Sequence, residues 1–296
     1  MKHPFEDYLF DFYEYLLLEP LSIIYTARKE TKVEDFQNFS NLIIDKFAIH
    51  SASFFHLSKG IIELKQSTET VRISGYDLFS VNTVFRTMIE NYATFNHLFV
   101  EPRSVEEQKF RFLLWKIDGL FEKQKFEIME TDFLQAKSII DSDKKILDLA
   151  IRDFENCELY SQLSKDQIKK IYKPETRKFS WRFLLDGDKI VPLKITELVK
   201  HTCRTRDFIN NYRYTSIHTH TNYLALEHFE QTRGKPISEE YTNPNIKLAI
   251  YLTSMLISDI CSIDSNAEKA FEKLPKVVQE YITKITTEIK NENANS

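Results

Sequence analysis

The chain has 296 residues, of which 42% are hydrophobic and 13% aromatic, and its formal net charge is −4. This composition supplies enough apolar surface for a large buried core and excludes a disordered chain. Only 5 glycines and 8 prolines are present, too few for the many turns that an extended β-sheet needs. We therefore expect an all-α fold, a multi-helix bundle of about eight to ten helices with one small β-hairpin.

The composition also bears on the cellular compartment. The three cysteines, Cys157, Cys203 and Cys261, are far apart and match no CxxC or metal-binding spacing. No run of about 18 apolar residues occurs, and the acidic N-terminus lacks the apolar stretch of a signal peptide. We expect a cytoplasmic protein without a metal, a cofactor or a membrane partner.

The N-terminal part of the chain shows apolar residues at helical spacing. A first helix is predicted from Pro4 to Leu18 and a second from near Ile23. The sequence Thr31–Glu34 has the form of a capping box and predicts a long third helix to about Leu64. We expect these N-terminal helices, residues 1–70, to pack on a core domain of residues 71–296, although one continuous domain is the alternative.

The rest of the chain is predicted to be helical with one interruption. The sequence predicts further helices over residues 74–99, 104–126, 132–159, 195–201, 205–223, 246–263 and 275–290. The interruption is Phe183–Val191, in which two short apolar segments flank Asp186-Gly187. An Asp-Gly pair between such segments is typical of a β-hairpin.

The common catalytic motifs are missing from the sequence. It contains no GxGxxG, Walker loop, HExxH or GxSxG pattern, and no Glu-x-x-His pair of the kind that holds a di-iron centre. The candidate site residues are therefore polar groups on two otherwise apolar helices.

The first of these helices carries Arg86 and Glu90, four residues apart beside a broad apolar stripe. Desolvating a charge costs several kcal/mol, so a half-buried ion pair needs good partners and is a site candidate. The alternative is an ordinary surface pair at i,i+4 spacing, worth about 0.2–0.5 kcal/mol. If the pair is buried, we expect it to contact the second polar helix.

The second helix is unusually polar between Asn211 and His220. On a straight helix Arg213 and His220 share a face. His218 lies about 140° round from Arg213 and reaches it only if the helix bends or another chain contributes. Either histidine could instead be an ordinary packed or exposed side chain. A hydrolase that uses Ser216 with His220 is a further alternative, without a nucleophile elbow to support it.

These residues carry two family resemblances. Arg213, with Asn211 two residues before it and with four residues between it and His218 or six between it and His220, resembles the Arg-x4-6-His motif of HEPN-domain ribonucleases. These helical enzymes occur among bacterial toxins and abortive-infection proteins. They usually carry a small polar residue after the arginine, where this chain has Tyr214.

The second resemblance is to an uncharacterised bacterial helical family. It rests on an Arg-x3-Glu pattern, here Arg86 and Glu90, followed by a Tyr-x3-Ser-x3-His pattern, here Tyr212, Ser216 and His220. Together, the two patterns cover the region from about residue 71 to residue 229.

The HEPN resemblance implies a metal-independent endoribonuclease, acting in phage defence as a homodimer or with an operon-encoded partner. In that chemistry a histidine, His218 or His220, serves as general acid or base, and Arg213 stabilises charge on the phosphorane. Arg86 and Glu90 would support the site. The alternative is a non-catalytic helical subunit of a defence system that senses a ligand or regulates a partner.

A basic segment is a candidate RNA-binding surface. From Lys165 to Arg213 the chain has 13 Lys or Arg and 6 Asp or Glu, a charge of +7 that leaves −11 for the remainder. We expect Lys169, Lys170 and Lys178 to contact RNA phosphates. A solvated lysine-rich surface is the alternative.

Overall fold

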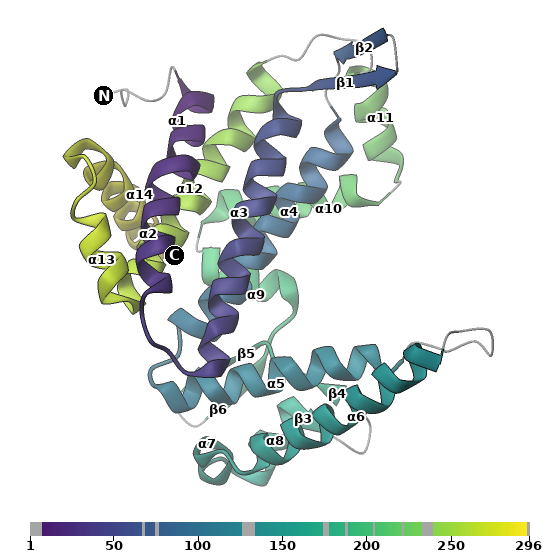
Figure 1. Ribbon diagram of the computed structural model, residues 1–296, viewed down its shortest axis with the longest axis vertical. Coiled ribbons are helices and arrows are strands. Elements are labelled where there is room, and N and C mark those ends of the chain that lie inside the picture. The colour runs from purple at the N-terminus through teal and green to yellow at the C-terminus, as the bar shows by residue number, and fades with distance from the viewer. Residues whose placement is uncertain are drawn as a thin grey trace. The chain divides into compact units, whose positions relative to one another are not determined.

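The computed structural model describes residues 8–66, 69–74, 77–125, 134–173, 178–186, 189–203, 205–220, 222–232 and 239–294 (Figure 1). Helices dominate this part of the chain, and each strand pairs only in a two-stranded antiparallel hairpin. The all-α prediction is confirmed. The predicted hairpin is confirmed as well, with strands β5 (Phe183–Asp186) and β6 (Lys189–Pro192), while Gly187 lies outside the described residues.

The chain divides into two compact units. Unit 1 joins residues 1–96 to residues 199–296, and unit 2 is residues 97–198. This differs from the expected division at residue 70, because the N-terminal and C-terminal helices share one core. The helices of unit 1 are α1 (Leu9–Leu16), α2 (Ser22–Lys29), α3 (Asn38–Ser58), α4 (Leu78–Phe95), α10 (Arg206–Thr219), α11 (Tyr223–Thr232), α12 (Glu239–Ile263), α13 (Ser265–Phe271) and α14 (Lys276–Ala294).

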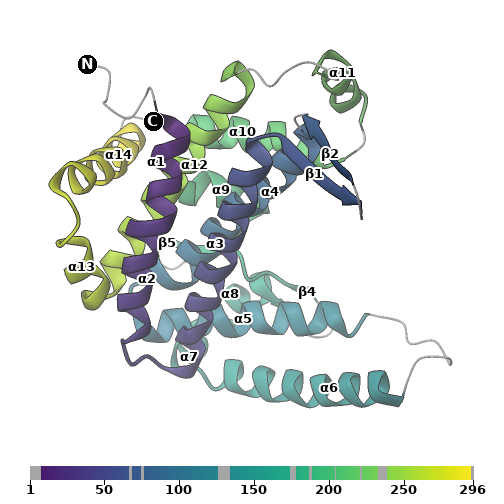
Figure 2. The ribbon, with the colours of Figure 1, turned by 45° about the horizontal axis from the view of Figure 1, so that its top comes forward.

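The core of unit 1 is formed by long helices from both ends of the sequence. Helix α4 packs between α3 and α10, and α12 packs against α1 and α14. Helices α3 and α4 lie side by side in both views (Figures 1 and 2). The rings of Phe54 on α3 and Phe85 on α4 are fully buried and lie 5.2 Å apart. This packing fixes which face of α4 is left to carry polar residues.

Proline shapes the N-terminal helices differently from the prediction. The expected helix end before Pro20 is replaced by a π-helical turn, Leu17–Leu21, which contains Pro20 and connects α1 directly to α2. Proline lacks the backbone N–H of the regular helical ladder, and a widened turn accommodates this loss. The buried side chains of Leu16, Leu21 and Ile24 keep this segment on the core.

The third predicted helix is too long at both ends. Its capping box lies at Glu34 and Gln37 rather than at Thr31–Glu34, and it opens a short 3-10 turn before α3. Helix α3 ends at Ser58, and Gly60 adopts a positive φ of 64° that favours glycine. Strands β1 (Ile61–Gln66) and β2 (Glu69–Ser74) then form a hairpin where helix and loop were expected.

The apolar helix α12 is confirmed as a central element. Its segment Thr242–Ile263 is long and apolar enough to cross a membrane, but most of that segment is buried inside the protein. Ile250, Leu252 and Ile257 have no exposed surface. Burial of this kind is typical of a helix in a protein core.

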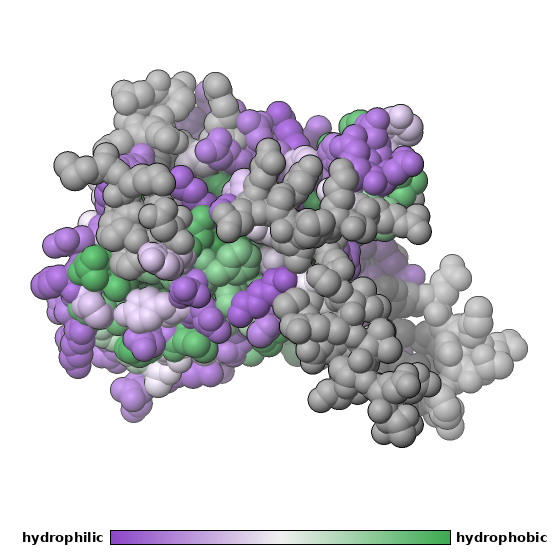
Figure 3. Space-filling model, turned by 90° about the horizontal axis from the view of Figure 1, so that it is seen from above, coloured by the Kyte–Doolittle hydropathy of each residue, from purple (hydrophilic) through white to green (hydrophobic). Residues whose placement is uncertain are grey.

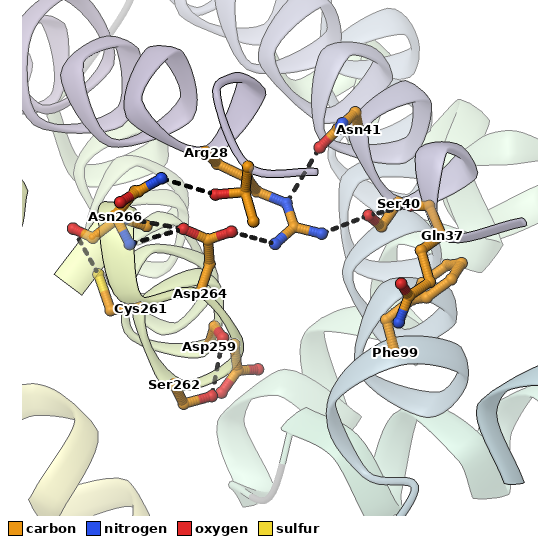
Figure 4. Close-up of polar contacts among 12 residues, drawn as sticks. Arg28, Gln37, Ser40, Asn41, Phe99, Asp259, Cys261, Ser262, Asp264 and Asn266 are labelled. Atoms are coloured by element: carbon orange, nitrogen blue, oxygen red, sulfur yellow. Dashed lines mark hydrogen bonds and ion pairs between the residues drawn. The ribbon is translucent and has the colours of Figure 1, made fainter. Parts of the chain in front are cut away.

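A buried ion pair connects α2 to the start of α13 (Figure 4). Arg28, only 4% exposed, donates from Nη1 to Asp264 Oδ2 at 3.3 Å and from Nη2 to Ser40 Oγ at 2.6 Å. Its Nε donates to Asn41 Oδ1 at 3.0 Å. Because Asp264 Oδ1 also accepts from the backbone N–H of Ala267 at 2.9 Å, one carboxylate neutralises Arg28 and caps α13.

In the described part of unit 2, four α-helices and two antiparallel hairpins follow a π-helical turn at Asn96–Val100. The helices are α5 (Val105–Lys123), α6 (Leu134–Glu155), α7 (Glu158–Gln162) and α8 (Lys165–Ile171). Strands β3 (Tyr172–Lys173) and β4 (Lys178–Phe179) form one hairpin, and β5 and β6, which follow in the sequence, form the other. Helices α5 and α6 pack against each other through the rings of Phe110 and Phe154, 4.8 Å apart. Helix α9 (Ile195–Cys203) spans the boundary to unit 1.

Unit 2 contains its own buried polar cluster. Arg111, 2% exposed, donates to Glu107 Oε1 at 2.6 Å and to Glu101 Oε2 at 2.9 Å. The fully buried His97 donates from Nε2 to the Trp181 carbonyl at 3.1 Å, and its Nδ1 lies 2.7 Å from Arg111 Nη1. Burial lowers the pKa of His97, so the neutral ring that accepts from Arg111 is favoured and the cluster is internally satisfied.

The surface mixes apolar and hydrophilic residues. Figure 3, which looks onto the upper end of the view in Figure 1, shows apolar residues in green among hydrophilic ones in purple. Large apolar side chains that reach the surface include Tyr223, 76% exposed, and Leu226, 49% exposed, both on α11.

Candidate functional site

The candidate site begins with two charged residues on α4. Asp77 caps this helix by accepting from the Ser80 backbone N–H, and buried residues such as Phe85 and Met88 set its core-facing side. Arg86 and Glu90 lie on the flank of that buried side, with side chains 21% and 36% exposed. Arg86 Nε donates to Glu90 Oε1 at 2.9 Å. The pair is therefore neither fully solvated nor fully buried.

Both charged residues contact α10, as expected from their burial. Arg86 donates from Nη1 to Ser216 Oγ at 2.7 Å and from Nη2 to the Tyr212 hydroxyl at 3.0 Å. The Tyr212 hydroxyl in turn donates to Glu90 Oε1 at 2.7 Å. Four polar side chains from two helices thus form one closed network, which we call the Arg86 network, and the surface-pair alternative for Arg86 and Glu90 is wrong.

The electrostatics of the network keep Arg86 charged and Tyr212 protonated. Burial acts to lower the pKa of Arg86, but the hydrogen bond and charge of Glu90, together with Tyr212, raise it above its ordinary value. Burial, reinforced by the hydrogen bond and charge of Glu90, raises the pKa of Tyr212 to about 12. At neutral pH the phenol is therefore a hydrogen-bond donor and not an anion.

The Arg86 guanidinium keeps unused hydrogen-bonding capacity. A guanidinium has five N–H donors. The three hydrogen bonds described above use the Nε–H and one N–H on each terminal nitrogen. The group also stacks over the Tyr212 ring at 4.8 Å, which fixes its plane. A held guanidinium with N–H groups left over suits recognition of a phosphate or carboxylate oxygen.

The Arg213–His218 pair of the tight HEPN-like spacing is not brought together. Helix α10 is continuous from Arg206 to Thr219, so the bend that would bring His218 to Arg213 is absent. Thr215 is fully buried, and Arg213 lies about 160° round the helix from it, which leaves Arg213 exposed. His218 lies on the buried side and is only 2% exposed.

His218 belongs to a cluster of rings rather than to the Arg86 network. Its ring packs against Tyr214 at 4.6 Å and Phe79 at 6.3 Å, and stacks on His228 of α11 at 5.4 Å. The Nε2 atom of His218 lies 3.4 Å from His228 Nδ1. Burial, and then the charge of His228, lowers the pKa of His218. Sequence reasoning missed His228 because nothing in the sequence pairs it with His218, ten residues earlier.

His220 lies just beyond the end of α10. It is the C-cap residue, with an extended backbone (φ −113°, ψ 145°), and its side chain is exposed. The expectation that it shares the Arg213 face of a straight helix is corrected, since the helix ends at Thr219. It follows Ser216 by four residues in the sequence and lies beyond the last helical residue of α10.

The Ser216 hydroxyl is committed to the Arg86 network. It accepts from a cation, and among the described residues no hydrogen bond joins it to His220. A serine nucleophile needs a base that takes its proton. The hydrolase alternative is therefore unsupported by the geometry.

The remaining predicted residues lie elsewhere. Asn211 is half-buried and donates to Asn245 Oδ1 on α12 at a long 3.5 Å. Lys169 and Lys170 are exposed on α8, and Lys178 starts β4, although its side chain lies outside the described residues. These lysines belong to unit 2, whereas the Arg86 network belongs to unit 1.

A comparison with known protein families gives a match over the middle of the chain. The sequence pattern of a protein family described only as being of unknown function matches residues 54–236. The matched region includes α4 and α10, and therefore the whole Arg86 network. A search of curated proteins and a search of solved structures gave no match.

Proposed function

The chain belongs to DUF5677, a family of unknown function, and we propose that it is a HEPN-like, metal-independent endoribonuclease whose site is the Arg86 network with His220. The HEPN resemblance further suggests that it acts in the cytoplasm as a toxin or effector of phage defence. In this proposal the catalytic arginine is Arg86 rather than Arg213, and the catalytic histidine is His220 rather than His218. The reaction is the one that the HEPN resemblance implies.

One observation carries the proposal: Glu90, Tyr212 and Ser216 hold a guanidinium between α4 and α10, and an exposed histidine follows the end of α10. Arg86 has N–H donors to spare and is fixed by Ser216 at 2.7 Å. An arginine arranged in this way can bind a phosphodiester oxygen and stabilise its added charge in the transition state. His220 is a histidine, the residue type that most often acts as general acid or base in enzymes.

The reaction needs no group beyond the protein and the RNA. A base takes the proton of the ribose 2′-hydroxyl, and its oxygen attacks the adjacent phosphorus. The bond from phosphorus to the 5′-oxygen breaks, and an acid gives that oxygen a proton. The products are a 2′,3′-cyclic phosphate and a 5′-hydroxyl. His220 serves as one of the two proton-transfer groups, and the other is supplied by a second copy of the chain in a homodimer.

The direct test is cleavage of RNA by the purified protein in EDTA, tested as the assembled oligomer. We expect 2′,3′-cyclic phosphate and 5′-hydroxyl ends, and no cleavage of DNA, which lacks the 2′-hydroxyl. Removing an acid or base costs about 10² to 10⁴ in rate, so His220→Ala is expected to lose activity to that extent. His56→Ala, which removes an exposed histidine on α3, is the matched control and should cleave normally.

The second candidate is a non-catalytic helical subunit that regulates a partner or senses a ligand. It is favoured by the closed hydrogen bonding of the Arg86 network, because a satisfied set of polar groups also serves simply to fix α4 against α10. If the wild-type oligomer leaves varied RNAs intact, with any operon-encoded partner present, the ribonuclease proposal fails and this reading replaces it.

A further inference from the structure

Unit 1 has an open cavity between α10, α12 and α14, away from the Arg86 network. Its volume is about 690 Å³, within the range of about 300–1,000 Å³ typical of small-molecule sites. Tyr214 lines the cavity and lies about 160° round α10 from Ser216 of the Arg86 network. The cavity is thus a separate feature, and nothing in the ribonuclease proposal requires it.

The apolar part of the wall is aromatic and aliphatic. Helix α10 contributes Tyr214, α12 contributes Leu248 and Tyr251, and α14 contributes Ile285. Tyr214, Leu248 and Tyr251 are only half-buried, so part of each side chain is open to a ligand. A wall of this composition binds the apolar or aromatic body of a small molecule.

The charged residues of the wall are exposed and favour a cation. Asp207 of α10 and Glu288 of α14 are acidic and Lys247 of α12 is basic, so these three side chains sum to a charge of −1. Glu288 also lies 3.8 Å from Lys284 Nζ, but these side chains are 62% and 58% exposed, and such a pair is weak. A ligand with one positive charge neutralises the three, whereas an anion is repelled by both carboxylates.

One ring of the wall already holds an ammonium group. Lys247 Nζ lies over the Tyr251 ring, 5.8 Å from its centre. The negative face of an aromatic ring attracts cations, so the position over Tyr251 suits a positive charge. Lys247 is exposed and its four-carbon chain is flexible, so its ammonium group can move into solvent and leave this position to a ligand.

We infer that this cavity binds an organic monocation, an ammonium group attached to an apolar or aromatic body. The ammonium group of the ligand replaces that of Lys247 over Tyr251, in the field of the Asp207 and Glu288 carboxylates. The body of the ligand packs on the apolar wall, which includes Leu248. Neither an anion nor a neutral molecule of the same shape uses both parts of this wall.

The test is calorimetric titration of the full chain with three probes of similar shape and different charge. Phenethylamine is a cation at pH 7, since alkyl amines such as lysine have a pKa of about 10.4; 2-phenylethanol is neutral and phenylacetate is an anion. We expect phenethylamine to bind about tenfold more tightly than 2-phenylethanol, and phenylacetate to bind most weakly. The proposal is overturned if phenethylamine does not bind at millimolar concentration, or if 2-phenylethanol binds equally well.

Two carboxylate variants test the charge. Asp207→Asn combined with Glu288→Gln keeps the size of both side chains and removes both negative charges. This double variant should lower the affinity for phenethylamine about tenfold and leave that for 2-phenylethanol unchanged. An unchanged affinity for phenethylamine, or an equal loss for both probes, contradicts the role given to the carboxylates.

A lysine variant tests whether the ligand replaces Lys247. Lys247→Met removes the ammonium group and keeps an unbranched side chain, so it should tighten phenethylamine binding several-fold. The matched control is Lys269→Met, the same change at an exposed position of α13 outside the cavity, which should have no effect. Leu248→Trp fills the cavity and should abolish binding. If Leu248→Trp does not fold, Lys247→Met decides, and an unchanged or weaker affinity in it contradicts the proposal.

Discussion

Arg86 Nη1 donates to Ser216 Oγ at 2.7 Å, and this bond joins two helices that are 130 residues apart in the sequence. The same guanidinium holds Glu90 and Tyr212. A short hydrogen bond between such distant segments forms only when the protein folds. The contribution of the network to the free energy of unfolding can therefore be measured by mutation, independently of any assay of catalysis.

We predict that Arg86→Ala lowers the free energy of unfolding by about 1–3 kcal/mol, because Glu90 and Tyr212 lose a partner. Tyr212→Phe removes two hydrogen bonds and is expected to cost about 1 kcal/mol. In a double-mutant cycle the two changes should be non-additive by about 0.5–3 kcal/mol. Urea unfolding followed by circular dichroism measures all three values.

The control for this cycle is Arg213→Ala. Arg213 is the same residue type on an exposed position of α10, so its removal should change stability by no more than about 0.5 kcal/mol. Additive effects of Arg86→Ala and Tyr212→Phe would show that the network is not coupled in solution.

We predict opposite consequences for the two histidines of α10. His218→Ala removes a buried ring that packs on Tyr214 and His228, so it should destabilise the protein by about 2–4 kcal/mol. His220→Ala removes an exposed ring and should leave the thermal midpoint unchanged while it lowers RNA cleavage. Thermal unfolding and the cleavage assay, run on both variants, separate the roles. If His218→Ala lost activity without losing stability, His218 rather than His220 would be the catalytic histidine.

The contact between the two polar helices could be predicted from the sequence because local rules apply to it. Spacing of four residues places Arg86 and Glu90 together on any helix, and buried charges require partners. Tyr212 and Ser216 are two of the several polar residues expected on the other helix, and they are those partners.

Which side of α10 is buried could not be predicted from such local rules. His218 is buried because it packs against Phe79 of α4 and His228 of α11, whereas Arg213 lies on an exposed side of α10. Which side of α10 is covered depends on this tertiary packing and not on local spacing. The β1–β2 hairpin was missed for a related reason: a short apolar run fits a strand or a helix until its partner is known. His228 became part of the ring cluster only through the turn after α10.

We predict that the basic residues of α8 position RNA and do not cleave it. Lys169 and Lys170 are exposed, and each phosphate contact with a single strand contributes about 0.7 to the slope of log affinity against log salt. Lys169→Ala with Lys170→Ala should reduce that slope by about 1.4, with an unchanged cleavage rate at saturating RNA. Filter binding between 50 and 200 mM salt measures the slope, and an unchanged slope would assign these lysines to an ordinary solvated surface.

We predict that Arg28→Ala destabilises unit 1 by about 3–5 kcal/mol, because it leaves the buried Asp264 carboxylate without its cation. Asp264→Asn keeps an oxygen that can cap α13 but removes the charge. Arg28→Met with Asp264→Asn should recover part of the loss, since no buried charge then remains. Chemical unfolding of the three variants tests this, and a double variant less stable than both single variants would contradict the charge argument.

The last prediction concerns acid stability and follows from the buried ring of His218. Its pKa in the folded protein is lowered by burial and then by the charge of His228, whereas in the unfolded chain it is about 6.5. The unfolded state therefore binds more protons at acidic pH, and the stabilisation from neutral His218 is complete above about pH 6.5 and lost as the pH falls below that value. His218→Gln cannot titrate, so its stability should fall less steeply than that of the wild type between pH 7.5 and 5.5. Comparing slopes removes the contribution of His97, which is buried in both proteins. Equal slopes would mean that His218 is protonated to the same degree in the folded and unfolded chains.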